Sequence, residues 1–189
     1  MNIAETLPPV PLTGETPTRM LIAEHAVILR GLTALEDRLT AWEGEAPPDP
    51  AYLEKAVEFL RGFADRCHHG KEEGILFKAM VEELDFPRTA GPVAVLTREH
   101  EQGRAFLRKM GEAAAVLGQD PAALRQVIES GRGYIQLLRL HIARENDVVF
   151  PMVDQFLDDT DNARLARQFE EFERREMGAD SHEALARLL

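Results

Sequence analysis

The sequence is poor in cysteine and in aromatic residues: its 189 residues include one cysteine, one tryptophan and two tyrosines. A single cysteine, Cys67, excludes an intramolecular disulfide framework, a four-cysteine zinc site and an iron–sulfur cluster held by cysteines. Basic residues are also outnumbered, with 22 Lys and Arg against 33 Asp and Glu and a formal net charge of −11. This acidic balance argues against nucleic acid or an anionic membrane surface as the main partner.

Long apolar runs are missing as well. No uncharged stretch approaches the roughly 20 apolar residues of a membrane helix, and the first residues lack the cationic start and apolar segment of a signal peptide. We therefore expect a cytoplasmic protein. With 44% hydrophobic residues, the chain is long enough to bury the core of a single domain. Abundant Ala, Leu, Glu and Arg favour helices, and no segment reads as a strand.

Proline marks the start of most predicted helices. Thr16-Pro17, Asp49-Pro50 and Asp120-Pro121 each combine a capping side chain with proline at the first helical position, and Phe86-Pro87 and Gly91-Pro92 bracket a turn. Together with the apolar periodicity, these signals predict helices over about 18–42, 51–84, 92–117, 121–157, 163–176 and 181–189. Pro151 is expected to kink the fourth helix or to end its regular part.

Four long helices joined by short loops predict an all-α, up-down-up-down four-helix bundle with a short C-terminal helical extension. An irregular all-helical domain is the alternative. The predicted division is a proline-rich extended arm (1–17), the bundle (18–158) and the extension (159–189). The amphipathic stretch 165–173 either covers one end of the bundle or contributes to a dimer interface, so we expect a monomer or a homodimer.

The histidines form a duplicated pattern. The segment 67–77 (CHHGKEEGILF) aligns with 140–150 (LHIARENDVVF), which pairs His68 with His141 and Glu72 with Glu145. Glu24-His25 and Glu99-His100 form a second match, so each half of the chain supplies one lone His and one His-x-x-x-Glu. Residues four apart share a helical face, about 6 Å apart along the axis, and both can turn toward one metal site.

Each of these side chains also falls on a core-facing stripe of its helix. Buried carboxylates and imidazoles are costly unless they are paired or bind a cation. A core of satisfied histidines is the structural alternative, but the duplication favours metal. Nitrogen and oxygen donors without thiolate suit iron, manganese or zinc. Ferritin-like bundles use Glu-x-x-His motifs, and that pattern is not duplicated here.

These motifs resemble the hemerythrin-like, or HHE cation-binding, family of non-haem di-iron four-helix bundles. The matching stretches cover about residues 18–158 and are Glu24-His25, CHHGKEEGILFK (67–78), Gly91-Pro92 through REHEQGR (98–104) and HIARENDVVFP (141–151). The resemblance implies two iron ions with an oxo or hydroxo bridge, with manganese or zinc as substitutes. It also implies that the ligands are His25, His68, Glu72, His100, His141 and Glu145, with the two glutamates as bridges.

One position departs from the oxygen-carrying members, which use five histidines. Their third helix has a second histidine, whereas this chain has Arg104 four residues after His100. His69 is the alternative fifth ligand. In an α-helix it lies about 100° around the axis from His68, so its other interpretation is an outer or helix-interface residue.

Three further residues are candidates for an outer layer around the ligands. Glu24 and Glu99 are placed to orient ligand histidines, as metal-bound imidazoles commonly require, or else are solvated or interhelical acids. Tyr134 lies two turns before His141 and either directs its hydroxyl into an oxygen pocket or is a core aromatic.

The resemblance thus predicts a protein that binds or senses dioxygen or a related small oxidant, or that handles iron. The alternative is an oxidoreductase acting on peroxide or nitric oxide, or a repair protein for iron–sulfur centres. The residues favour a metal- and oxygen-binding protein over a dedicated enzyme, and they do not identify the physiological ligand.

Overall fold

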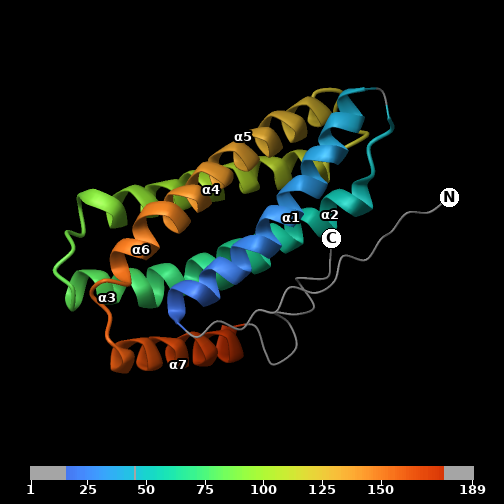
Figure 1. Ribbon diagram of the computed structural model, residues 1–189. Coiled ribbons are helices and arrows are strands. Elements are labelled where there is room, and N and C mark those ends of the chain that lie inside the picture. Colours follow the sequence, from blue (N-terminus) through green and yellow to red (C-terminus); the bar gives the residue numbers. More distant parts are fainter. Residues whose placement is uncertain (1–15, 45, 177–189) are drawn as a thin grey trace.

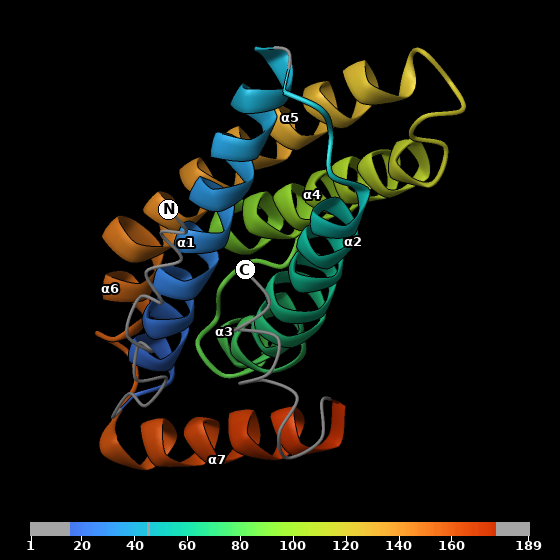
Figure 2. The same ribbon diagram turned by 90° about the vertical axis from the view of Figure 1, so that its right-hand side faces the viewer.

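Four long helical segments run up, down, up and down, and a fifth helix crosses one end of this bundle (Figures 1 and 2). The structure is a computed structural model that describes residues 16–44 and 46–176, and within these ranges it contains no strand. The predicted all-α bundle is therefore confirmed. The arm up to residue 15 and the predicted helix at 181–189 lie outside the described residues, and the three-part division into domains stays a prediction.

The second and fourth segments are composite, because each contains π-helical turns, in which N–H groups bond to carbonyls five residues back. In chain order the elements are α1 (Pro17–Glu43), α2 (Pro50–Phe59), the π-helices η1 (Leu60–His69) and η2 (Glu72–Leu76), α3 (Phe77–Glu82), α4 (Gly91–Ala115), α5 (Ala123–Arg144), the π-helix η3 (Glu145–Val149), α6 (Phe150–Val153) and α7 (Asp159–Glu176). None of these described helices combines the length and apolarity needed to cross a membrane.

The predicted caps form at the starts of α1 and α2. The Thr16 hydroxyl accepts a hydrogen bond from the Arg19 N–H at 3.4 Å, and the Asp49 carboxylate accepts bonds from the next two free N–H groups at 3.1 Å. The fourth segment begins two residues later than Pro121 and continues only two residues past Pro151. Side-chain capping thus sets where α1 and α2 begin, as the sequence pattern indicates, whereas α4 and α5 begin without a side-chain cap.

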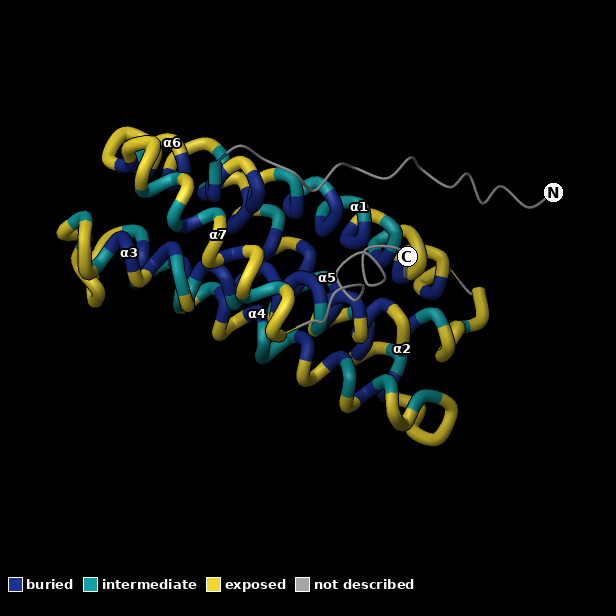
Figure 3. Tube along the Cα trace, turned by 90° about the horizontal axis from the view of Figure 1, so that it is seen from below, coloured by how far each residue is buried: buried dark blue, intermediate teal, exposed yellow. Residues whose placement is uncertain are grey.

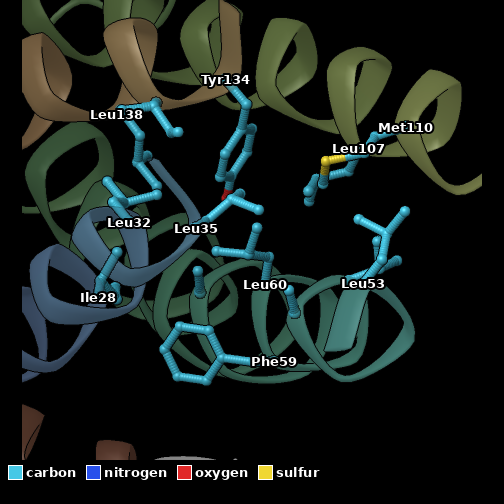
Figure 4. Packing of buried hydrophobic residues seen from close by; sticks show 14 of the residues in the cluster. Ile28, Leu32, Leu35, Leu53, Phe59, Leu60, Leu107, Met110, Tyr134 and Leu138 are labelled. Atoms are coloured by element: carbon cyan, nitrogen blue, oxygen red, sulfur yellow. The ribbon is translucent and has the colours of Figure 1, made fainter. Parts of the chain in front are cut away.

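The hydrophobic core consists of two separate clusters. The first fills the half of the bundle around Leu35, Leu60 and Tyr134 (Figure 4). The second lies at the other end, around Leu21, Leu96 and Phe150. On every long segment the buried positions continue between the two clusters (Figure 3), and there the buried residues include five histidines and three glutamates.

Helix α7 packs on the bundle beside the second cluster. Leu165 and Phe169 are fully buried in that cluster. Gly70 allows the close approach, because a Cβ atom at this position would lie 2.7 Å from the Phe172 ring. The amphipathic stretch therefore covers the bundle, which is the first of the two interpretations given above.

Candidate metal centre

All seven predicted ligand residues meet in the polar layer between the two hydrophobic clusters. Their donor atoms form two groups, and within each group all atoms lie within 4.8 Å of one another. The groups are His25, His68, Glu72 and Glu145 on one side, and His69, Glu72, His100 and His141 on the other. Every one of these residues is buried. The four helical segments thus contribute five imidazoles and two carboxylates to one centre.

Each carboxylate faces one histidine of each group. Glu72 Oε1 lies 3.5 Å from His68 Nε2, and its Oε2 lies 3.3 Å from His100 Nε2. Glu145 Oε2 lies 3.3 Å from His25 Nε2 and 3.2 Å from the Nε2 of His141. Both glutamates therefore stand between the two groups, in matching positions of the two halves.

Most of the inward-facing atoms have no hydrogen-bond partner, although water does not reach them; the exceptions are the Nε2 atoms of His100 and His141, which lie 3.1 Å apart. The unpartnered atoms are Nε2 of His25, His68 and His69 and all four carboxylate oxygens of Glu72 and Glu145. Buried polar atoms without partners are rare and costly in a native protein. Here they converge on common points, and their nitrogen and oxygen lone pairs suit a divalent metal. The residues present fit a pair of metal ions.

The outward Nδ1 atoms, in contrast, are all hydrogen-bonded. His68 Nδ1 lies 2.8 Å from Glu24 Oε2, and His141 Nδ1 lies 3.0 Å from Glu99 Oε2. A carboxylate accepts a hydrogen bond from an Nδ1–H, and this tautomer leaves the Nε2 lone pair for the centre. Glu24 and Glu99 are thus in contact with ligand candidates on the neighbouring helix.

The two lone histidines have outer partners that sequence reasoning missed. His25 Nδ1 lies 2.7 Å from Asn146 Oδ1, and His100 Nδ1 lies 2.7 Å from Glu73 Oε1. Glu73 and Asn146 each follow the glutamate of a His-x-x-x-Glu motif. The alignment of the two halves pairs these positions, and this was the signal that could have found them.

A cation supports each of the orienting glutamates. Lys71 contacts Glu24 and also Glu173 of α7, while Arg144 Nη1 lies 2.6 Å from Glu99 Oε2. Lys71 is completely buried. Burial lowers the pKa of Lys71, but its carboxylate neighbours raise it more, so the side chain stays charged. The two halves of the chain therefore repeat the supporting cation as well as the orienting glutamate.

His69 reaches the centre because its segment is π-helical. A π turn holds more residues than an α turn, so adjacent side chains are separated by a smaller rotation. His68 and His69 consequently both point inward, which an α-helical rotation of about 100° did not predict. His69 Nδ1 lies 3.4 Å from Asp65 Oδ1. Burial and the neighbouring histidines hold the pKa of His69 well below 6.5, so its imidazole is neutral.

Arg104, four residues after His100 on α4, pairs with two acids of the outer layer. Its Nε donates to Asp65 Oδ1 at 2.8 Å, and its Nη2 donates to Glu73 Oε1 at 2.7 Å. Arg104 thereby holds the outer partners of both His69 and His100.

Neighbouring carboxylates outweigh burial and raise the pKa values of His25, His100 and His141. Burial lowers the pKa of His141, but the Glu145 carboxylate 3.2 Å away and the hydrogen bond to Glu99 outweigh this effect and raise the pKa to about 10. Burial alone would raise the pKa of Glu145. The neighbouring His141 and His25 have a larger opposite effect, so the pKa is lowered and the carboxyl is ionised. In metal-free protein, His141 therefore keeps a proton that balances part of the negative charge of the glutamates.

Tyr134 and Cys67 are both buried outside the two donor groups. Tyr134 is fully buried in the first hydrophobic cluster, where its hydroxyl has no hydrogen-bond partner (Figure 4). Burial raises its pKa well above the ordinary value. Cys67 is buried too, and burial raises the pKa of its thiol. A low-pKa reactive thiol is not the role of Cys67.

The fold is an all-helical bundle, and the polar layer between its two hydrophobic clusters is a buried cation-binding centre of histidines and carboxylates. The chain belongs to the hemerythrin HHE cation-binding domain family, whose model matches residues 16–153. Family membership and the buried donor clusters together identify a metal-binding domain.

Similar curated proteins occur in mycobacteria. The chain is 24% identical over 159 residues to uncharacterised proteins of Mycobacterium tuberculosis and Mycobacterium bovis. The match covers 84% of this chain, which spans 61% of the length of these relatives. No solved structure gives a significant match.

Proposed function

We propose that this protein binds two iron ions in the centre and uses them to bind or sense dioxygen or a related small oxidant, or to handle iron. One ion would be held by His69, His100 and His141, and the other by His25 and His68. Glu72 and Glu145 would be shared by both. The observation that carries the proposal is the convergence of buried, unpartnered Nε2 and carboxylate atoms into two groups with Glu72 in common.

The donor set supports iron. Five imidazoles and two carboxylates without thiolate suit iron, with manganese and zinc as competitors. When bound, a pair of ferrous ions supplies electrons for a small oxidant and a coordination position at which that oxidant binds. One donor group contains two histidines, His25 and His68, whereas the other contains three, so a position for a small ligand would lie on the side with two.

The chain itself fixes the imidazoles and keeps water out. The outer carboxylates and Asn146 hold the Nδ1 atoms, so the ligand rings cannot turn away. Phe150 stacks on His25 at 5.6 Å between ring centroids, and Phe77 stacks on His100 at 5.8 Å. The hydrophobic clusters close the layer above and below, which limits hydrolysis and loss of reactive species.

The decisive experiment is anaerobic reconstitution of the full chain with ferrous iron, followed by metal analysis and absorption spectra before and after exposure to air. We expect two irons per chain and an oxygen-dependent charge-transfer band. A Glu101→Gln variant, altered at an exposed acid on α4, serves as the control and should behave like the unmodified protein. Binding of markedly fewer than two irons, or stoichiometric zinc without a spectral response, would contradict the proposal.

The same preparation separates binding from catalysis. A reversible spectral change without consumption of oxidant supports carriage or sensing. Sustained turnover of hydrogen peroxide or nitric oxide instead favours the oxidoreductase alternative.

A further inference from the structure

A surface cavity of about 510 Å³ lies outside the metal centre, between the second helical segment and α4. Its walls are rich in arginine although the chain is acidic overall. The residues that line it are Arg61, Asp65, Arg66, Gly70, Arg104, Leu107 and Arg108. Arg104 and Arg108 are four residues apart on α4 and thus share one face of that helix.

The cationic charge of this cavity is largely uncompensated. Arg104 is paired with Asp65 and Glu73. In contrast, no carboxylate within 16–44 or 46–176 forms an ion pair with Arg61, Arg66 or Arg108, and Arg61 donates instead to the Leu107 carbonyl at 3.3 Å. Clustered like charges without counterions repel one another and raise the local concentration of anions. Three such guanidinium groups around one hollow point to an anionic ligand.

We propose that this cavity binds a small phosphate-type oxyanion, free or as part of an organic phosphate. Guanidinium groups present planar pairs of donors that match phosphate oxygens, and they form charge-assisted hydrogen bonds of high strength. Leu107 and the aliphatic stems of the arginines provide apolar surface for a small organic portion. The volume falls within the range of about 300–1,000 Å³ that is typical of small-molecule pockets.

The test compares two double variants with the same change in charge. Arg66→Gln with Arg108→Gln removes two unpaired cavity cations. Arg98→Gln with Lys109→Gln removes two exposed cations of α4 that do not line the cavity. Arg104 is left unchanged, because it also holds Asp65 and Glu73 beside His69 and His100.

Inorganic phosphate is titrated into the metal-loaded full chain at constant ionic strength, with binding heat measured by calorimetry and metal content measured before and after. We expect saturable binding by the unmodified protein and the control variant, and a dissociation constant about tenfold higher or more in the cavity variant. Circular dichroism verifies that both variants keep their helices.

Three results would overturn the proposal. They are no saturable binding by the unmodified protein, an equal loss in both variants, which indicates a general charge effect, and full retention in the cavity variant, which places phosphate elsewhere, for example at the metal. Because metal content is measured separately, failure of the anion site is distinguishable from failure of the proposed di-iron centre.

Discussion

The two halves of the bundle, α1–α3 and α4–α6, repeat the same contacts around the donor histidines but differ at a few neighbouring positions. In each half a lone histidine follows a glutamate, that glutamate contacts the histidine of the His-x-x-x-Glu motif, and a cation just before the motif's glutamate supports the contact. Each π turn that follows begins at the motif's glutamate, Glu72 or Glu145. The repeated part thus places both carboxylates symmetrically between the histidine groups.

The two halves differ at positions outside these repeated contacts. His69 has Ile142 as its counterpart, and Asp65 has Leu138. Lys71 is buried beneath α7, whereas the side chain of Arg144 is 39% exposed. The comparison separates two functions of the architecture: the duplicated residues create a shared pair of carboxylates, and the unduplicated ones make the two metal positions unequal.

Removal of either shared carboxylate should have the largest effect and should be the same in both halves. Glu72→Gln and Glu145→Gln keep the shape of the side chain but remove its charge. We expect fewer than one metal ion per chain, and a loss of metal-linked stability on the order of 3 kcal/mol. Metal analysis and urea unfolding with metal present test this, with Glu101→Gln as the control. An effect of only one of the two substitutions would mean that the carboxylates are not equivalent.

His69→Ile makes the first half resemble the second and should remove one ion. The side with His25 and His68 keeps all its donors, so we expect the metal content to fall from two ions to about one. Ile142→Val, at the counterpart position, is the control and should retain both. Two ions bound with unchanged affinity in His69→Ile would exclude this histidine from the ligand set.

The orienting glutamates should affect metal affinity equally but stability unequally. Glu24→Gln and Glu99→Gln are each expected to weaken metal binding about 10–100-fold, because their histidines lose a charged partner. In metal-free protein, Glu24→Gln should cost about 3–5 kcal/mol, since it breaks a buried ion pair with Lys71. The partly exposed Glu99–Arg144 pair should contribute about 1 kcal/mol or less. If urea unfolding shows that Glu24→Gln and Glu99→Gln lower the free energy of unfolding equally, the difference in burial between the two ion pairs does not determine their contribution.

The last comparison, between metal-free and metal-loaded protein, concerns a reversal of pH dependence. In metal-free protein the pKa of His141 is raised from 6.5 to about 10, so the protonated imidazole stabilises the fold fully below pH 6.5 and progressively less as the pH rises toward 10. Metal binding requires deprotonated histidines, so metal-linked stability increases with pH instead.

Melting temperatures of metal-free and metal-loaded protein should therefore change in opposite directions above pH 6.5. His69→Ile is the control for the metal-free slope. The pKa of His69 is lowered in the fold, so this histidine titrates only below that window. Parallel slopes in the two forms would refute the assignment of the proton to this layer.

Much of the fold was predictable from the sequence because its signals are local. Thr16-Pro17 and Asp49-Pro50 cap the helices that they were expected to cap, and the duplicated motifs placed His25, His68, His100 and His141 in one layer. The orientation of His69 was not predictable, because a π turn adds a residue that a 3.6-residue period does not reveal.

Other outer contacts depend on tertiary packing. Lys71 meets Glu173 across 102 residues of sequence, and Arg104 meets Asp65 across 39. Only the close approach of α7 and of α4 to η1 creates these pairs. The contacts of Glu73 and Asn146, in contrast, followed a repeat that was already visible in the alignment.

The division of the hydrophobic core into two clusters has a consequence for folding cooperativity. Each cluster is a smaller core at one end of the same four helical segments, and within the described residues a layer of buried histidines and acids separates the two. Ions in that layer would couple the two ends into one all-or-none unit, whereas their loss would let each end open on its own. The ligands would then determine not only how stable the bundle is but also how many independent units it contains.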